Sequence, residues 1–239
     1  MSVEELEALL SVQERDTALD RLRHRRTTLP ERDDVESRRA QLDAKQAALA
    51  GVRARRQTVL AEERRLDDES RATGERADDV DKRLYSGSVT SPRELQAMQA
   101  DLDMLRRQRS DLEDLELEVM EQREALDAEV EGLETEIAAL EADVARLRTA
   151  IAGAEADIDA AIAEESNARD AAAKPVGDAL LRDYERRRTQ NKGAGAARLV
   201  GTTCQACHLT IPSTEAERIR RAAGNEVAYC DNCSAILVP

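Results

Sequence analysis

Apolar residues recur at alternating steps of three and four through most of the chain, which predicts long amphipathic helices paired along a narrow seam. The cleanest run extends from Met98 to Ile158 and keeps this register throughout, although a few of its positions hold charged residues. A second run covers residues 31–84, and a shorter amphipathic stretch covers residues 3–28. Pro30 separates these two because proline disfavours helix at the residue before it. So regular a spacing excludes a disordered chain.

The connector between the two long helices predicts a sharp turn at residues 85–91. It begins at Tyr85, and Gly87 allows the chain to reverse. Ser91 is suited to capping the next helix, and Pro92 to its first helical position. We therefore expect the chain to fold back on itself.

Helix lengths agree with a hairpin. Residues 92–170 would form a helix of about 118 Å, and residues 31–84 and 3–28 together about 120 Å, at about 1.5 Å per residue. Two N-terminal helices laid end to end therefore match one C-terminal helix. This predicts an antiparallel coiled-coil hairpin over residues 1–174, in a protein of mainly α class.

The remaining residues, 175–239, predict a small separate domain. Short helices are expected at about 176–190 and 214–223, the latter with Gly224 as its stop. Short strands are expected at 198–200, 227–229 and 235–238.

Composition supports thin helical seams rather than a large globular core. The chain has no Phe or Trp and only three Tyr among 239 residues, although aromatic side chains usually dominate core burial. Its net charge is −14, but residues 175–239 hold nine Lys/Arg against seven Asp/Glu. The acidic coiled coil would therefore repel nucleic acid, which could bind only to the C-terminal part.

The N-terminus has neither the basic nor the apolar region of a secretory signal, and no apolar run is long enough to span a membrane. We therefore expect a cytoplasmic protein without a membrane partner. In a reducing cytosol, cysteines bind metal more often than they form disulfides.

All four cysteines lie in two CxxC motifs, Cys204–Cys207 and Cys230–Cys233. Two such pairs at this spacing predict a zinc ribbon, in which four thiolates hold one tetrahedral Zn²⁺. A redox pair or a disulfide is the alternative. Four thiolates close the coordination sphere, so the metal would be structural. Because the chain also shows no catalytic constellation and no phosphate loop, we expect no enzyme and no small-molecule substrate.

The single sizeable basic run precedes the ribbon. Phosphate contact is one interpretation, and a solvated helix face, with cations placed favourably near a helix C-terminus, is the other. The candidate nucleic-acid-binding residues are Arg182, Arg186, Arg187, Arg188, Lys192 and Arg198.

Charged residues interrupt both helical seams. Arg56 and Glu63 lie on one helix, and Arg109, Glu116 and Arg123 lie at facing depths on the other. We expect them to pair across the hairpin and fix its register. Exposed side chains that extend away from a thin seam are the alternative.

Three segments together resemble the bacterial C4-type zinc-ribbon coiled-coil proteins: 85–95 at the turn, and 197–209 and 229–237 around the two CxxC motifs. The Ala- and Arg-rich composition is similar to that of an actinobacterial, in particular a mycobacterial, member. The resemblance implies a helical hairpin that carries a ribbon, with Cys204, Cys207, Cys230 and Cys233 as zinc ligands. Relatives in flagellated and chlamydial bacteria are associated with an alternative sigma factor that actinobacteria generally lack, so that partner is not expected here.

Two functions remain open at this point. The first is a non-enzymatic protein that binds RNA or DNA through the ribbon and the adjacent basic run. The second is a protein–protein adaptor or scaffold for transcription or translation machinery, which would use the surfaces of the hairpin and the ribbon.

Overall fold

The computed structural model describes residues 2–222 and 226–239, so the expected helix stop at Gly224 lies outside the described residues. Five helices and four short strands follow one another along the described chain. Their bounds are α1 Val3–Thr27, α2 Glu31–Tyr85, α3 Pro92–Ala173, α4 Asp178–Gln190, β1 Ala196–Val200, β2 Thr203–Cys204, α5 Ser213–Ala222, β3 Ala228–Tyr229 and β4 Ile236–Val238.

The chain divides into two compact units. One unit contains residues Met1–Asp33 and Leu147–Pro239, and the other contains Asp34–Arg146. The predicted fold class, a long helical hairpin with a small C-terminal ribbon, is confirmed. The predicted division into 1–174 and 175–239 stays a prediction.

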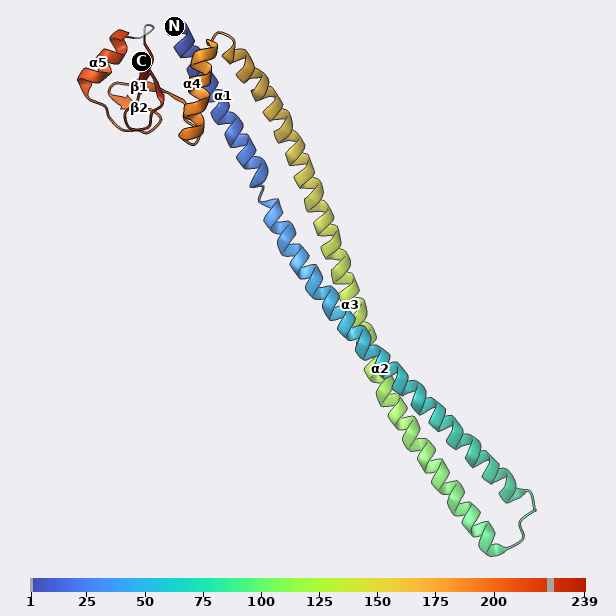
Figure 1. The fold of residues 1–239 in the computed structure, drawn as a ribbon. Coiled ribbons are helices and arrows are strands. Elements are labelled where there is room, and N and C mark those ends of the chain that lie inside the picture. Colours follow the sequence, from blue (N-terminus) through green and yellow to red (C-terminus); the bar gives the residue numbers. More distant parts are fainter. Residues whose placement is uncertain (1, 223–225) are drawn as a thin grey trace. The chain divides into compact units, whose positions relative to one another are not determined.

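In the unit Asp34–Arg146, α2 and α3 pair antiparallel along the predicted seam (Figure 1). Val52, Leu66, Leu102 and Val144 are buried there, while most other seam positions are half-buried, as two helices alone can cover them only partly. Arg109 is the exception, because this predicted seam residue is exposed.

The polar seam residues pair only in part as expected. Arg123 donates to Glu63 across the seam, with Nη1–Oε1 at 2.9 Å. Arg56 instead meets Asp127 of the facing helix. Arg109 pairs with Glu113 of its own helix at 2.8 Å, so cross-seam pairing is wrong for this residue, whose guanidinium packs over Gly74.

The pair of Glu63 and Arg123 should contribute measurably to hairpin stability, since the two side chains are only 17% and 28% exposed. A double-mutant cycle of Glu63→Ala and Arg123→Ala should give a coupling free energy of about 1 kcal/mol. The same cycle on the more exposed pair of Arg53 and Glu134 serves as the control. Equal coupling in the two cycles would show that burial adds nothing.

In the other unit, a four-stranded sheet of order β2-β1-β4-β3 separates two apolar clusters. β1 and β4 pair in parallel, and β3 pairs antiparallel with β4. Side chains of a strand alternate between its faces. Ala196, Ile236 and Val238 therefore face a cluster with α1 and α4, whereas Ala197, Leu199 and Leu237 face the cysteines and α5.

The first cluster joins the ribbon to the helices. It contains Leu6, Leu9, Leu10 and Val12 of α1, with Leu180 and Tyr184 of α4. A ribbon this small buries too little apolar surface to fold alone. It shares this core with α1 and α4 instead.

Candidate metal centre and its anchorage

The four cysteine sulfur atoms lie within 4.8 Å of one another. Cys204 and Cys233 sulfurs are 3.9 Å apart, and those of Cys207 and Cys230 are 3.8 Å apart. The edge of a tetrahedron with metal–sulfur bonds of about 2.3 Å measures about 3.8 Å. The donor set therefore fits one structural, tetrahedral Zn²⁺ held by four thiolates.

The two zinc knuckles are the turns that contain Cys204–Cys207 and Cys230–Cys233, and their backbone hydrogen bonds follow the same pattern. In the first, the Cys204 N–H donates to Leu209 O at 3.1 Å and the His208 N–H to Cys204 O at 2.8 Å. In the second, the Cys230 N–H donates to Ala235 O at 2.9 Å and the Ser234 N–H to Cys230 O at 2.7 Å. Each CxxC is thus wrapped in a closed turn that orients its two sulfurs toward the same point.

Burial and peptide dipoles act oppositely on the thiols. Burial raises the pKa of Cys204 and raises that of Cys233 to about 12, because the charged thiolate loses water. The Leu209 N–H lowers the pKa of Cys207, since it donates to the sulfur. A coordinated zinc ion supplies the positive charge that keeps buried thiols deprotonated.

His208 serves the knuckle through its backbone. Its φ is 59° and that of the equivalent Ser234 is 60°, the left-handed region in which a side chain is strained. His208→Gly should therefore keep or raise zinc affinity. His208→Val should lower it about tenfold, because a β-branched residue is particularly disfavoured there.

Competition with a chromophoric chelator measures both His208 variants, with Ser234→Gly as the matched control on the second knuckle. If the imidazole were a replacement ligand, His208→Gly would lose affinity as well.

The basic run lies at the joint where the ribbon packs against α1 and α4, and several of its arginines form ion pairs with carboxylates. Arg198 of β1 donates to Glu7 of α1 at 3.0 Å, and Arg188 pairs with Asp20 of α1. Arg186 pairs with Asp183 of its own helix. Arg182 and Lys192 are exposed.

Arg187 fastens the second knuckle to α4. Its Nη1 donates to Ser234 O at 2.7 Å, its Nε donates to Asp183 at 2.9 Å, and its guanidinium stacks 3.7 Å above the Tyr229 ring. Burial opposes ionisation of Asp183, but hydrogen bonds from Arg187 and Arg186 outweigh it and lower the pKa of Asp183.

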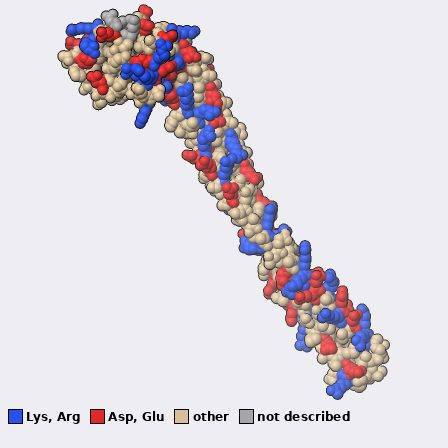
Figure 2. Space-filling model, viewed as in Figure 1, with Lys and Arg blue, Asp and Glu red and all other residues tan. Residues whose placement is uncertain are grey.

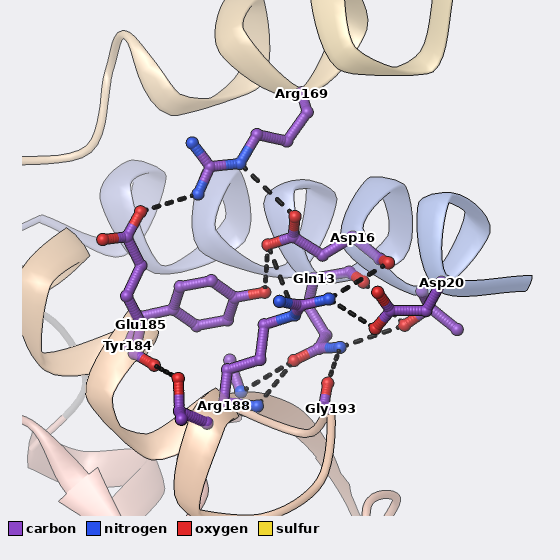
Figure 3. A network of polar contacts seen from close by, with 12 residues as sticks. Gln13, Asp16, Asp20, Arg169, Tyr184, Glu185, Arg188 and Gly193 are labelled. Carbon is purple, nitrogen blue, oxygen red and sulfur yellow. Dashed lines mark hydrogen bonds and ion pairs between the residues drawn. The ribbon is translucent and has the colours of Figure 1, made fainter. Parts of the chain in front are cut away.

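A buried carboxylate, Asp16 of α1, centres a polar network beneath this joint (Figure 3). Tyr184 is fully buried and donates its hydroxyl to Asp16 Oδ2 at 2.7 Å. Arg169 of α3 approaches Asp16 Oδ1 at 3.4 Å, and Arg188 of α4 approaches Oδ2 at 3.7 Å. Burial and the Asp16 carboxylate raise the pKa of Tyr184, so its hydroxyl stays a donor. Asp16 therefore joins three helices.

Gln13, one turn before Asp16, holds the start of β1. Its Oε1 accepts from the backbone N–H groups of Gly195 at 2.7 Å and Ala196 at 3.2 Å, and its Nε2 donates to Gly193 O at 2.8 Å. A Cβ on Gly195 would lie 2.6 Å from Tyr184, so only glycine permits this approach.

The predicted turn residues lie in the unit Asp34–Arg146. α2 ends at Tyr85, Gly87 has a φ of 73°, and the Leu95 N–H donates to Ser91 O at 3.0 Å in the first turn of α3, which begins at Pro92. Tyr85 is 77% exposed.

Sequence reasoning did not find Gln13, Asp16, Arg169 or Tyr184. One pattern could have indicated Asp16. Leu9, Val12, Asp16 and Leu19 follow seam spacing, so a carboxylate occupies a seam position in α1. Its partners come from distant segments, which no local pattern predicts.

Two family models match the chain. The CT398-like coiled coil hairpin domain matches residues 12–192, and the C4-type zinc ribbon domain matches residues 203–237. These are families of coiled-coil and zinc-ribbon domains and not known enzyme families. Within the described residues, none of the helices combines the length and apolar character needed to cross a membrane.

Similar proteins cover nearly the whole chain. The uncharacterized protein Rv2229c of Mycobacterium tuberculosis is 34% identical over 97% of this chain and 94% of its own. A solved structure from Mycobacterium smegmatis has a TM-score of 0.85 and 28% identity, covering 100% of this chain and 98% of that one.

More distant structures share the fold alone. CT398 from Chlamydia trachomatis has a TM-score of 0.52 and 17% identity, over 98% of this chain and 96% of its own. HP0958 from Helicobacter pylori has a TM-score of 0.50 and 15% identity over the same shares. The chain belongs to the family of CT398-like coiled coil hairpin proteins that carry a C4-type zinc ribbon.

Proposed function

We propose that this protein is a non-enzymatic, zinc-dependent adaptor of the cytoplasm, which binds a protein partner from the transcription or translation machinery. The observation that carries the proposal is the use made of the basic run. Arg187, Arg188 and Arg198 each form an ion pair with a carboxylate of their own unit. Arg187 also donates to the Ser234 carbonyl and stacks on the Tyr229 ring. Phosphate groups would have to compete with these contacts.

The ribbon offers apolar side chains instead. Val200 at the end of β1 is 54% exposed and Leu209 after the first knuckle is 53% exposed. Val200 lies in the hairpin of β1 and β2, where it pairs with Thr203, and the Leu209 carbonyl accepts from the Cys204 N–H in the turn that follows. Apolar residues held on a rigid frame are favourable contacts for a protein partner, because little side-chain entropy is lost on binding.

Affinity capture with the full chain after nuclease treatment tests the proposal. A protein partner should be retained, and the Val200→Ser/Leu209→Ser double variant should lose it. Val3→Ser, which removes a comparably exposed apolar residue from α1, should keep it. A partner that disappears on nuclease treatment would contradict the proposal.

Binding of RNA or DNA is the second candidate, favoured by one groove. Arg21 of α1, Lys192 and Arg198 line it together with Gln205 of the first knuckle. Glu14 and Asp20 line it too, which reduces its positive charge.

Salt dependence distinguishes this candidate. Affinity for a single-stranded oligonucleotide should fall steeply with salt, and Arg182→Ala/Lys192→Ala should flatten the slope by about 0.7 per lost phosphate contact. These two exposed residues are better probes than Arg187 and Arg188, whose removal would also disturb the joint. Salt-insensitive binding would exclude this candidate.

A further inference from the structure

The turn between α2 and α3 carries the one tyrosine ring that the described fold does not use. Tyr184 is buried in the shared core, and the ring of Tyr229 lies under Arg187. Tyr85 is 77% exposed, in a chain with no Phe or Trp. Exposed Tyr and Arg residues are typical of positions that dominate binding energy in protein interfaces.

The same turn is a small basic island in an acidic coiled coil. Residues 82–93 contain Lys82, Arg83 and Arg93 and no carboxylate. Residues 75–81 before it contain four carboxylates and one arginine, and residues 94–103 after it contain three carboxylates and no Lys or Arg. Arg83 and Arg93 are exposed, whereas Lys82 lies 3.7 Å from Asp79.

The rest of the turn surface is neutral and polar. Ser86, Ser88 and Thr90 are exposed, and Gly87 with its φ of 73° sharpens the reversal. Figure 2 shows largely uncharged surface at this end of the α2–α3 pair, with few charged side chains.

We propose that this turn is a docking surface for a short acidic segment of a partner protein, with Tyr85 as the apolar anchor and Arg83 and Arg93 as the carboxylate contacts. The proposal rests on the adaptor function and names one of its surfaces.

The short length of the basic island favours an acidic peptide over RNA or DNA as the binding partner. A strand of RNA or DNA that continued past the turn would meet the acidic flanks of α2 and α3 within about one Debye length, about 8–10 Å. A peptide with a few carboxylates ends before it reaches them. Arginine also binds a carboxylate with two parallel hydrogen bonds, which gives such a contact geometric specificity.

Display selection on the full-length zinc-loaded protein tests the proposal. A library of short random peptides is selected on the wild-type chain and counter-selected on Tyr85→Ser/Arg83→Gln/Arg93→Gln. The enriched peptides should be acidic with at least one large apolar residue. Fluorescence anisotropy of one such peptide should show about tenfold weaker binding to the triple variant. Substitution of Gln for its acidic residues should weaken binding similarly.

Two controls separate local docking from the effect of net charge. Arg64→Gln/Arg107→Gln removes two exposed arginines from the same helices outside the turn and should leave peptide affinity unchanged. Equal weakening in this control, enrichment of peptides without acidic residues, or tighter binding of an oligonucleotide to the same turn would overturn the inference. In the nuclease-treated affinity capture, a partner retained by the turn variant would overturn this surface and leave the adaptor function standing, whereas capture of no protein would overturn the adaptor function itself.

Discussion

Removal of zinc should unfold the ribbon and also loosen the helices that share its core. Binding of structural zinc contributes about 10–16 kcal/mol in zinc-finger peptides. Without it, β1 and β4 lose the frame that presents Ala196, Ile236 and Val238 to α1 and α4. Hydrogen exchange with mass spectrometry should then show lost protection in β1–β4 and, to a lesser degree, in α1 and α4.

The helix pair of the unit Asp34–Arg146 should keep its protection on chelation, because it shares no residue with either apolar cluster of the ribbon. Far-UV circular dichroism should fall only slightly, since α2 and α3 hold 55 and 82 helical residues. Re-addition of zinc is the control and should restore protection. Full protection of α1 in the zinc-free protein would contradict the shared core.

Asp16→Ala should be among the most destabilising single substitutions in the unit that contains the ribbon. It leaves Arg169 and Arg188, each less than a quarter exposed, without their shared carboxylate, and it leaves the buried Tyr184 hydroxyl without an acceptor. Loss of one partner from a buried ion pair costs about 3–5 kcal/mol, and the loss here should lie near the lower value because Arg169 keeps Glu185 and Arg188 keeps Asp20. Chemical denaturation should report a loss of that order.

Two further variants assign the Asp16 effect to its cause. Tyr184→Phe removes one hydrogen bond and should cost about 1–2 kcal/mol. Asp170→Ala removes a carboxylate that is 70% exposed and should change stability little. A loss in Asp16→Ala no larger than in Asp170→Ala would show that the network does not hold the joint.

The helices and the zinc ligands could be predicted from local pattern. A seam that repeats every three or four residues fixes which helix face is buried, and Gly87 and Pro92 mark the reversal. Two CxxC motifs have few other chemical uses at this spacing. Strands β3 and β4 fall within two of the predicted strand ranges, 227–229 and 235–238.

The role of the basic run could not be predicted in the same way. Arg187, Arg188 and Arg198 resemble a phosphate-binding patch in sequence because their partners, Ser234, Asp16 and Glu7, lie in distant segments. The predicted pairing of Arg109 across the seam was wrong for a related reason. A long side chain on a two-helix seam can reach a carboxylate of its own helix as easily as one of the facing helix.

The sequence by itself determined the paired helices, the reversal between them and the four-thiolate zinc ligand set, because each follows from residues close together along the chain. Only the tertiary structure decided how the ribbon is anchored. β1 pairs in parallel with β4, and Gln13 accepts a hydrogen bond from the backbone just before β1. Asp16 contacts one tyrosine and two arginines of α3 and α4. Such contacts depend on which surfaces meet after the chain has folded back, and local periodicity carries no information about that.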